Sequence, residues 1–230
     1  MPALRALFAA TVAAGSLLAA SAQASVNFYT SQAAFNGAST TSLLEDFSTA
    51  PVKDAPLSSL TLNGITYTGL AGSPFPNVFV SSPGYSNYGA NVGLTTEYIL
   101  TSNGDENNVA AFSTTYTAVG FNAFYNGLGD GTLTVFGPAS AVIGTFLFSG
   151  GFNPATGLAD RGYLGFTSSA PITGFQWDTT AGGQLNTGFT NISVGTAGVG
   201  VPEPATWTLM LAGFGGLGAM LRRRRAALAV

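Results

Sequence analysis

The chain has 230 residues, of which 46% are hydrophobic and only 7% are charged, and it contains no cysteine and no histidine. Ordinary soluble domains carry charge on roughly a quarter of their residues, so this composition is unusual for a cytosolic globular protein. The missing residue types exclude disulfides, thiol nucleophiles, histidine-based catalytic triads and the usual zinc or transition-metal sites.

The first 24 residues predict a secretory signal peptide. Arg5 supplies positive charge, and an apolar run over residues 6–20 follows it. Ala22 and Ala24 then flank Gln23 in the small-x-small pattern of a cleavage site. We therefore expect the mature chain to begin near Ser25.

Residues 25–195 predict one β-rich ectodomain. A short helix is expected after Ser31, whose hydroxyl can cap it. Asn63-Gly64 is a strong hairpin signal between strands at Leu57–Leu62 and Ile65–Thr68. The further expected strands are Val78–Ser81, Glu97–Thr101, Val109–Ser113, Ala118–Tyr125, Thr132–Phe136, Val142–Phe148, Gly162–Phe166, Ile172–Trp177 and Phe189–Val194. Many short strands with frequent turns predict an antiparallel β-sandwich or jelly roll.

The charge of this part of the chain is strongly acidic. Between residues 25 and 201 only Lys53 and Arg161 are basic, against nine acidic residues, which gives a net charge of −7. Such a field repels phosphate backbones, so we expect no nucleic-acid partner.

After a linker at 196–201, the segment 202–225 predicts a membrane anchor. Ala205–Leu221 is apolar or small throughout, and as a helix it would span roughly 25 Å of a hydrocarbon core of about 30 Å. The cluster Arg222–Arg225 belongs on the cytoplasmic side, with residues 226–230 as a short cytoplasmic tail, so the ectodomain is expected outside the cytoplasm. The G-x-G-x-x-G match at 213–218 lies inside this apolar segment and lacks the strand and the βαβ unit of a dinucleotide site.

Taken together, "VPEPATWTLMLAGFG" and "RRRR" resemble the PEP-CTERM sorting signal of exopolysaccharide-producing Gram-negative bacteria, a segment also labelled the ice-binding protein C-terminal domain. The resemblance implies that an exosortase, a membrane protease-transpeptidase, is a partner of the chain. It implies recognition through Pro202, Glu203, Pro204 and the arginines Arg222, Arg223, Arg224 and Arg225. It also implies an inner-membrane anchor before processing, followed by a cell-surface or extracellular location.

The ectodomain resembles, more loosely, others that carry such tails. The stretches "TAVGFNAFY", "RGYLGFTSSAPITGFQWDT" and "GFTNISVG" are similar to their closing strands. Those strands often carry an Asp-Asn pair where this chain has Thr190-Asn191, so a shared ligand site does not carry over. No regular Thr-x-Thr ladder of the kind that a flat ice-binding face needs is present; Thr132-x-Thr134 is a single instance.

Catalysis would have to rest on carboxylates or on a Ser-Lys pair. Lys53, the lysine available for such a pair, lies in a proline-flanked loop and is expected to be solvated. A glycosidase needs only two carboxylates, but no spacing selects a pair. The candidates are Glu45, Asp46, Asp105, Glu106, Asp130 and Asp178. We therefore expect no enzyme, with a glycan-processing hydrolase as the alternative.

Calcium is the metal that the sequence favours most. Ser102–Asn108 and Asn126–Gly131 concentrate oxygen ligands, with Asp105, Glu106 and Asp130 as candidates. The same residue types form ordinary Asx turns without an ion, so no cofactor is expected and calcium is the alternative.

Two tyrosines are candidates for stacking on sugar rings. Tyr85 and Tyr88 lie among small and polar residues in Ser82–Asn91 and are expected to be exposed, whereas Trp177 is expected in the core. The sequence thus predicts a non-catalytic surface or matrix protein that contacts extracellular polysaccharide. The alternatives are the hydrolase and a ligand-free structural scaffold.

Overall fold

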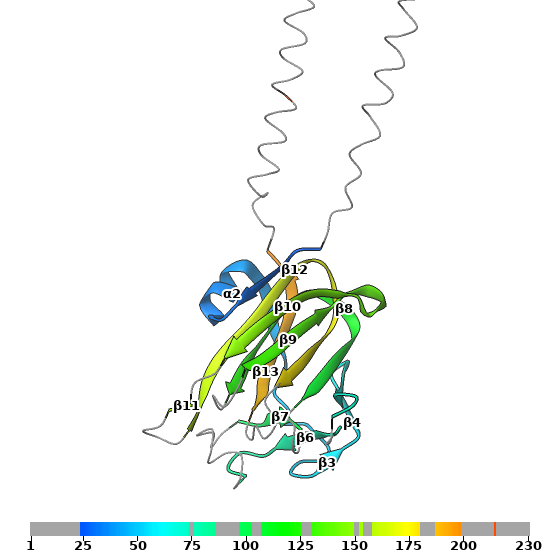
Figure 1. Ribbon diagram of the computed structural model, residues 1–230, viewed down its shortest axis with the longest axis vertical. Helices are drawn as coiled ribbons and strands as arrows, with labels where there is room; N and C mark the ends of the chain where they lie inside the picture. Colours follow the sequence, from blue (N-terminus) through cyan, green and yellow to red (C-terminus); the bar gives the residue numbers. More distant parts are fainter. Residues whose placement is uncertain are drawn as a thin grey trace, which may run out of the picture.

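The computed structural model describes residues 24–73, 76–85, 97–102, 107–125, 130–149, 152–153, 158–179 and 187–198, together with Phe214 (Figure 1). Antiparallel pairing joins the described strands throughout residues 24–198. The prediction of a mainly β, antiparallel fold is therefore confirmed.

The elements follow one another along the chain with a single short α-helix near the beginning of the described domain. Their bounds are β1 Val26–Tyr29, α2 Gln32–Ala38, β2 Ser39–Glu45, β3 Pro56–Leu57, β4 Ser59–Leu62, β5 Ile65–Gly69, β6 Val78–Ser81, β7 Ile99–Thr101, β8 Asn108–Tyr125, β9 Asp130–Phe136, the 3₁₀ helix η1 Pro138–Ser140, β10 Val142–Ser149, β11 Phe152–Asn153, β12 Leu158–Thr179 and β13 Gly188–Ala197.

Two local predictions are confirmed. The hydroxyl of Ser31 accepts a hydrogen bond from the backbone N–H of Ala34, which caps α2, and Phe35 anchors the helix by full burial. The hairpin turn between β4 and β5 consists of Asn63 and Gly64, which have φ angles of 46° and 79°. A type I′ turn needs left-handed backbone at both positions, and Asn followed by Gly adopts it at little cost.

The two longest strands correct the sequence prediction. Val109–Ser113 and Ala118–Tyr125 belong to the single strand β8, and Gly162–Phe166 and Ile172–Trp177 belong to β12. Pairing shifts register between Thr167 and Ile172 and again before Gly174, so β12 bends there without ending. The stretches 113–117 and 168–171, which are rich in serine and threonine or contain proline, look like loops in the sequence but lie in continuous strands.

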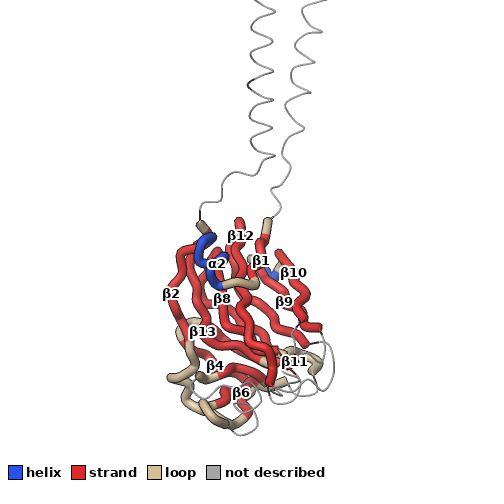
Figure 2. Tube along the Cα trace, turned by 90° about the vertical axis from the view of Figure 1, so that its left-hand side faces the viewer, coloured by secondary structure: helices blue, strands red, loops and turns tan. Residues whose placement is uncertain are grey.

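The bends divide one connected sheet into two halves. In one half the order is β10-β9-β12-β8-β5-β4, which uses the second part of β12 and the first part of β8. In the other, β1, the first part of β12, the second part of β8 and β13 lie side by side, and β13 continues to β2 and β7. Figure 2 shows β10 and β2 at opposite sides of the molecule. The sheet thus folds over on itself at its two long strands.

Aromatic side chains from both halves fill the space between them. Phe121 of β8 stacks on Phe175 of β12 with ring centroids 5.1 Å apart, and Phe189 of β13 lies edge-on to Trp177 at 6.0 Å. All four side chains are fully buried. Such pairs add to the free energy that burial of apolar area supplies, which is how a chain without disulfides holds this fold.

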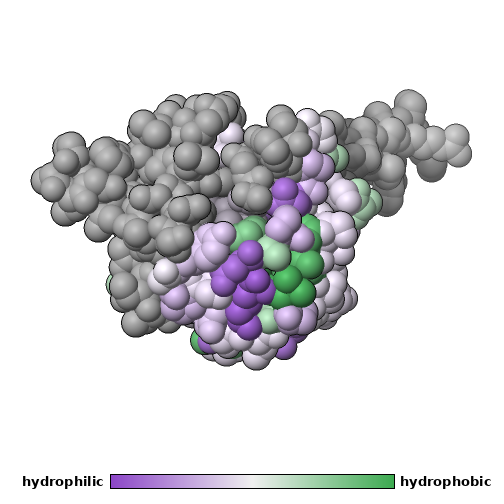
Figure 3. Space-filling view, turned by 90° about the horizontal axis from the view of Figure 1, so that it is seen from below, coloured by the Kyte–Doolittle hydropathy of each residue, from purple (hydrophilic) through white to green (hydrophobic). Residues whose placement is uncertain are grey.

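The chain enters and leaves the described domain at the same end, near α2 (Figure 1). Hydrogen bonds fix both segments there: Ser169 N–H donates to the carbonyl of Ser25, and Gly198 N–H to the carbonyl of Ala38. The opposite end, here called the loop end, comprises residues 47–57, 76–85 and 97–98. Seen from below, this part of the surface shows hydrophobic and hydrophilic areas side by side (Figure 3).

Candidate functional site

The outward face of β9 and the second part of β12 presents a row of polar groups beside one aromatic ring. Three register pairs define this surface, here called the outer platform: Thr132 with Asp178, Thr134 with Gln176, and Phe136 with Gly174. The residues between them point inward, because Leu133, Val135, Phe175 and Trp177 are fully buried core residues. At about 3.3 Å per residue, the platform runs for roughly 13 Å along the strands.

Its polar groups can both donate and accept hydrogen bonds. The amide of Gln176 donates to the carboxylate of Asp178 at 3.4 Å, so the two side chains lie together at one end. The hydroxyls of Thr132 and Thr134 bond to no other described residue. Each hydroxyl offers one donor and two acceptor positions to a ligand.

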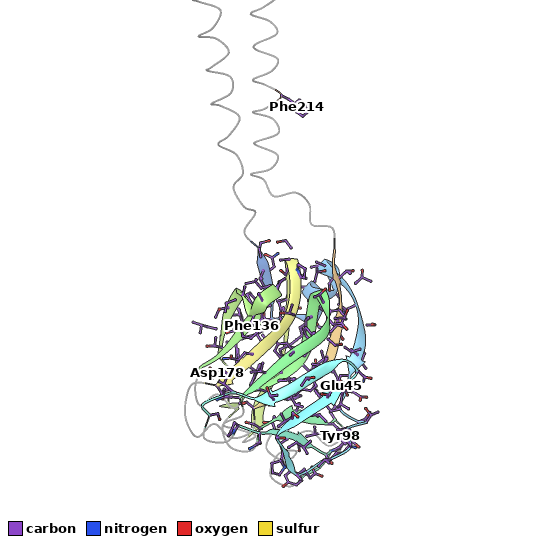
Figure 4. The ribbon with its side chains drawn as sticks, turned by 90° about the vertical axis from the view of Figure 1, so that its right-hand side faces the viewer. Glu45, Tyr98, Phe136, Asp178 and Phe214 are labelled. Carbon is purple, nitrogen blue, oxygen red and sulfur yellow. The ribbon has the colours of Figure 1, made fainter. Side chains whose placement is uncertain are left out.

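Phe136 forms the apolar end of the platform. Its ring is half-buried and lies outside the core clusters of the described residues. Its neighbour on β12, Gly174, has no side chain to cover it, and its neighbour on β10 is Val142. The hydroxyl of Thr173 donates to the carbonyls of Phe136 and Gly137, at 3.3 Å and 2.8 Å, which holds the strand end in place. In Figure 4, Phe136 and Asp178 lie on the same side of the domain, away from Glu45 and Tyr98.

The uncharged character of this face extends across all six strands of its half. Among the side chains that the structure describes, outward positions on these strands are Ser59, Thr61, Thr66, Thr68, Val109, Ala111, Thr132, Thr134, Phe136, Val142, Thr145, Leu147, Gln176 and Asp178. Asp178 is the one ionisable residue in this set. A face with hydroxyls, amides and almost no charge is suited to a neutral, hydroxyl-rich ligand.

Glu45, a candidate for acid–base catalysis, has a structural environment. Its carboxylate is buried and accepts hydrogen bonds from the backbone N–H of Phe47 and from the side-chain amide of Asn63, the latter at 2.8 Å. Asn63 also donates to the carbonyl of Leu44, so the carboxylate ties the β4–β5 turn to β2. Burial and, next, the charge of Glu45 raise the pKa of the Tyr67 hydroxyl, which is buried and has no hydrogen-bond partner among the described residues.

Of the candidate carboxylates whose side chains the structure describes, neither Asp46 nor Asp178 forms a catalytic pair with Glu45. Asp46 accepts hydrogen bonds from the hydroxyl and the N–H of Ser48, which lower its pKa. Asp178 lies on the opposite side of the domain from Glu45 (Figure 4). The remaining candidates, Asp105 and Glu106, fall outside the described residues, and Asp130 is described only through its place in β9. Within the described ranges no three acidic groups gather as a metal site would require, and the calcium hypothesis stays a prediction.

The loop end contains the predicted tyrosines. Tyr85, expected to be exposed, is half-buried, because its ring contacts Phe79 with centroids 5.6 Å apart; Tyr88 lies outside the described residues. Lys53, expected to be solvated, is half-buried as well. Its ammonium donates to the carbonyl of Ala50 at 2.8 Å and lies 5.3 Å from the centre of the Tyr98 ring.

The structure also places Trp177 and the pair Thr190-Asn191. Trp177 is fully buried, so the prediction that it belongs to the core is confirmed. Thr190 is buried as well, and its neighbour Asn191 donates to the carboxylate of Glu97 at 3.5 Å. These two residues therefore present no exposed ligand pair.

Sequence reasoning missed Phe136 and Gln176 as surface residues. The alternation in "TLTVF" indicates that Thr132, Thr134 and Phe136 share one face of a strand. It does not indicate that an aromatic ring on that face is turned away from the core. Phe136 pairs with Gly174, which lies far along the chain and has no side chain to cover the ring from the β12 side.

The predicted processing residues all lie outside the described residues, except Ala24 at the beginning of the described domain. This holds for Ala22, Pro202, Glu203, Pro204 and Arg222–Arg225, and for the helix predicted over Ala205–Leu221. Within the part of the chain that the structure describes, we find no helix with the length and apolar character needed to span a membrane.

Comparison with known proteins addresses the tail directly. A comparison with curated proteins gave no match. The family model of the PEP-CTERM protein-sorting motif matches residues 200–225, the segment that contains Pro202-Glu203-Pro204 and the arginine cluster. The chain therefore carries a PEP-CTERM protein-sorting motif, which implies an exported protein that an exosortase sorts.

Proposed function

We propose that this chain is an exported, non-catalytic surface or matrix protein that binds neutral polysaccharide on its outer platform. The observation that carries the proposal is the arrangement of a half-buried aromatic ring and a row of hydrogen-bonding groups on a nearly uncharged face. Ligand sites commonly combine apolar surface with a few placed polar groups. A hexose presents the matching chemistry, with an apolar ring face and hydroxyls at its edge.

The charge of the domain favours a neutral polymer over an anionic one. Residues 25–201 have a net charge of −7, and Asp178 adds a carboxylate to the platform itself. An anionic polysaccharide would be repelled by this field, most strongly at low ionic strength. The length of the platform, about 13 Å, is suited to two or three sugar units of an extended chain.

The position of the sorting motif leaves the platform accessible. The described domain ends at Gly198, on the side opposite to the loop end, and the motif begins two residues later in the sequence. We propose that residues 205–221 anchor the chain in the inner membrane before an exosortase removes them. The platform lies along the side of the domain (Figure 4), so we expect a ligand to reach it before and after processing.

Binding to the polysaccharide of the native host tests this proposal. The processed chain, purified from that host, is run through gels with and without the polysaccharide, and retardation is measured. Phe136→Ala and the double variant Gln176→Ala, Asp178→Ala should each weaken binding about tenfold or more, because each removes one kind of platform contact. Tyr85→Ala is the matched control, since it removes a half-buried aromatic ring from the loop end.

Several outcomes would contradict the proposal. Loss of retardation in Tyr85→Ala with unchanged Phe136→Ala would move the site to the loop end. Release of reducing sugar would favour the hydrolase. Binding that disappears with a calcium chelator would support Asp105, Glu106 or Asp130 as calcium ligands. No retardation of the wild-type chain would leave a ligand-free scaffold.

A further inference from the structure

Strand β10 is an edge strand that lacks the usual protection against pairing with another chain. Among the described strands it pairs only with β9. Its sequence, "VIGTFLFS", has no charged residue and no proline, the two residue types that most often blunt sheet edges. Two large apolar side chains on it are exposed, Leu147 at 72% and Val142 at 61%.

The inner side of β10 is firmly packed, so the strand is held in a fixed position. Phe146 stacks on Phe28 of β1 with ring centroids 5.2 Å apart, and Phe148 stacks on Trp177 at 4.3 Å. A pre-formed edge needs no reordering before it pairs, which lowers the entropic cost of association. Among the described residues, the protective device that we find is the irregularity in register between Val142 and Gly144, which affects only the beginning of the strand.

An uncharged edge strand lets a second copy of the chain be the partner in spite of the acidic charge of the domain. Most contacts between two copies of a domain with a net charge of −7 are unfavourable, but β10 has no ionisable residue and meets an identical strand without repulsion. An antiparallel pair of identical edges is also self-complementary under a two-fold axis. The backbone N–H and C=O groups that the edge presents to water can pair with those of another strand.

We propose that two copies of this chain associate through antiparallel pairing of their β10 strands. An eight-residue edge buries less area than a standard interface, so the dimer is weak and depends on concentration. A two-fold axis perpendicular to the sheet places both outer platforms on the same side of one continuous sheet. The pairing does not depend on whether those platforms bind polysaccharide.

This geometry has a consequence for anchored molecules, which rests on the proposed membrane anchor. Antiparallel pairing turns one copy end over end, so the two ends near Gly198 point in opposite directions. Two copies anchored in the same membrane therefore cannot pair in this way. Removal of the sorting segment would release the chain from this constraint.

Sedimentation of the full chain in detergent micelles tests the pairing. The wild type should show a concentration-dependent monomer–dimer equilibrium between about 1 μM and about 1 mM, the range of weak interfaces. Leu147→Lys should weaken dimerisation about tenfold or more, because it puts charge at the edge. Leu43→Lys is the matched control, since Leu43 is a 59%-exposed leucine on β2, at the opposite side of the sheet, and it should leave the equilibrium unchanged.

Two further measurements separate lost pairing from lost folding. Equimolar Leu147→Lys and Leu147→Glu should form a mixed dimer, because opposite charges replace like charges on the paired edges.

Since the chain has no cysteine, Thr145→Cys alone provides a single crosslinking position, and it should give covalent dimers at least tenfold faster than Ser42→Cys on β2. A wild type that stays monomeric throughout, equal effects of the two lysine variants, or equal crosslinking of the two cysteines would overturn the proposal.

Discussion

The two faces of the β9–β12 pair use the same strands for different purposes. On the inner face, Trp177 and Leu133 are fully buried, whereas their chain neighbours on the outer face, Gln176 and Thr134, contact solvent. The inner residues fill the gap between the two halves of the folded sheet and stabilise it. The outer residues contribute little to that packing, so their chemistry is free to serve recognition.

The largest effect that tests this contrast is expected at Trp177. Trp177→Ala removes a fully buried ring that contacts Phe148, Phe121 and Phe189, and should lower the free energy of unfolding by about 3–5 kcal/mol. Gln176→Ala changes the next residue on the opposite face and should stay within about 0.5 kcal/mol. Urea denaturation of both variants measures the difference. Similar losses in the two would mean that the faces are not energetically distinct.

The sequence predicted which residues form strands and face the core better than it predicted where the chain bends. Hydrophobic alternation identified most strands, and Asn63-Gly64 identified the hairpin. The bends escaped prediction because Ser168 and Ser169 look like loop residues, although register shifts let β12 continue through them. Strand β2 was missed because its threonines and serines form no apolar run; its pairing with β13 determines its place.

A smaller effect is expected where a polar group lies on the inner face. Tyr67→Phe removes a buried hydroxyl without a hydrogen-bond partner, so at pH 7 stability should stay unchanged or rise by about 1 kcal/mol. Burial and the charge of Glu45 raise the pKa of Tyr67 above the value near 10 of an unfolded chain. The wild type is therefore fully stabilised below about pH 10 and loses stability as the pH rises towards the folded-state pKa.

Tyr67→Phe should lose less stability than the wild type between about pH 9 and about pH 11, because this range brackets the pKa of tyrosine in the unfolded chain. Burial also raises the pKa of Tyr163, so part of the alkaline loss should remain in Tyr67→Phe. Urea denaturation at both pH values measures the change. An identical alkaline loss in the two proteins would show that Tyr67 does not titrate differently in the folded state.

The outer platform was harder to predict than the core, for a physical reason. Its residues come from two strands about forty positions apart, and only their register brings Phe136 beside Gly174 and Thr132 beside Asp178. Local patterns report which residues share a face of one strand, not which strand lies next to it. The prediction that the ring of Tyr85 is exposed was wrong for the same reason, since its packing partner Phe79 lies in a separate strand.

The smallest effect is expected on the outer face at the β4–β5 hairpin. The hydroxyls of Thr61 and Thr66 lie 3.0 Å apart on directly paired residues, and both side chains are at least partly exposed. Water competes for such a hydrogen bond, so a double-mutant cycle with Thr61→Val and Thr66→Val should give a coupling of about 0.2–1 kcal/mol. Valine keeps the shape and the β-branch of threonine, so the cycle measures the loss of the hydroxyls rather than of strand propensity. A coupling well above this range would mean that the outer hydroxyls help to hold the sheet together, and the division of labour between the two faces would then be weaker than the burial pattern indicates. A coupling within the range would leave these hydroxyls, like those of Thr132 and Thr134, available for exchange with the hydroxyls of a bound sugar.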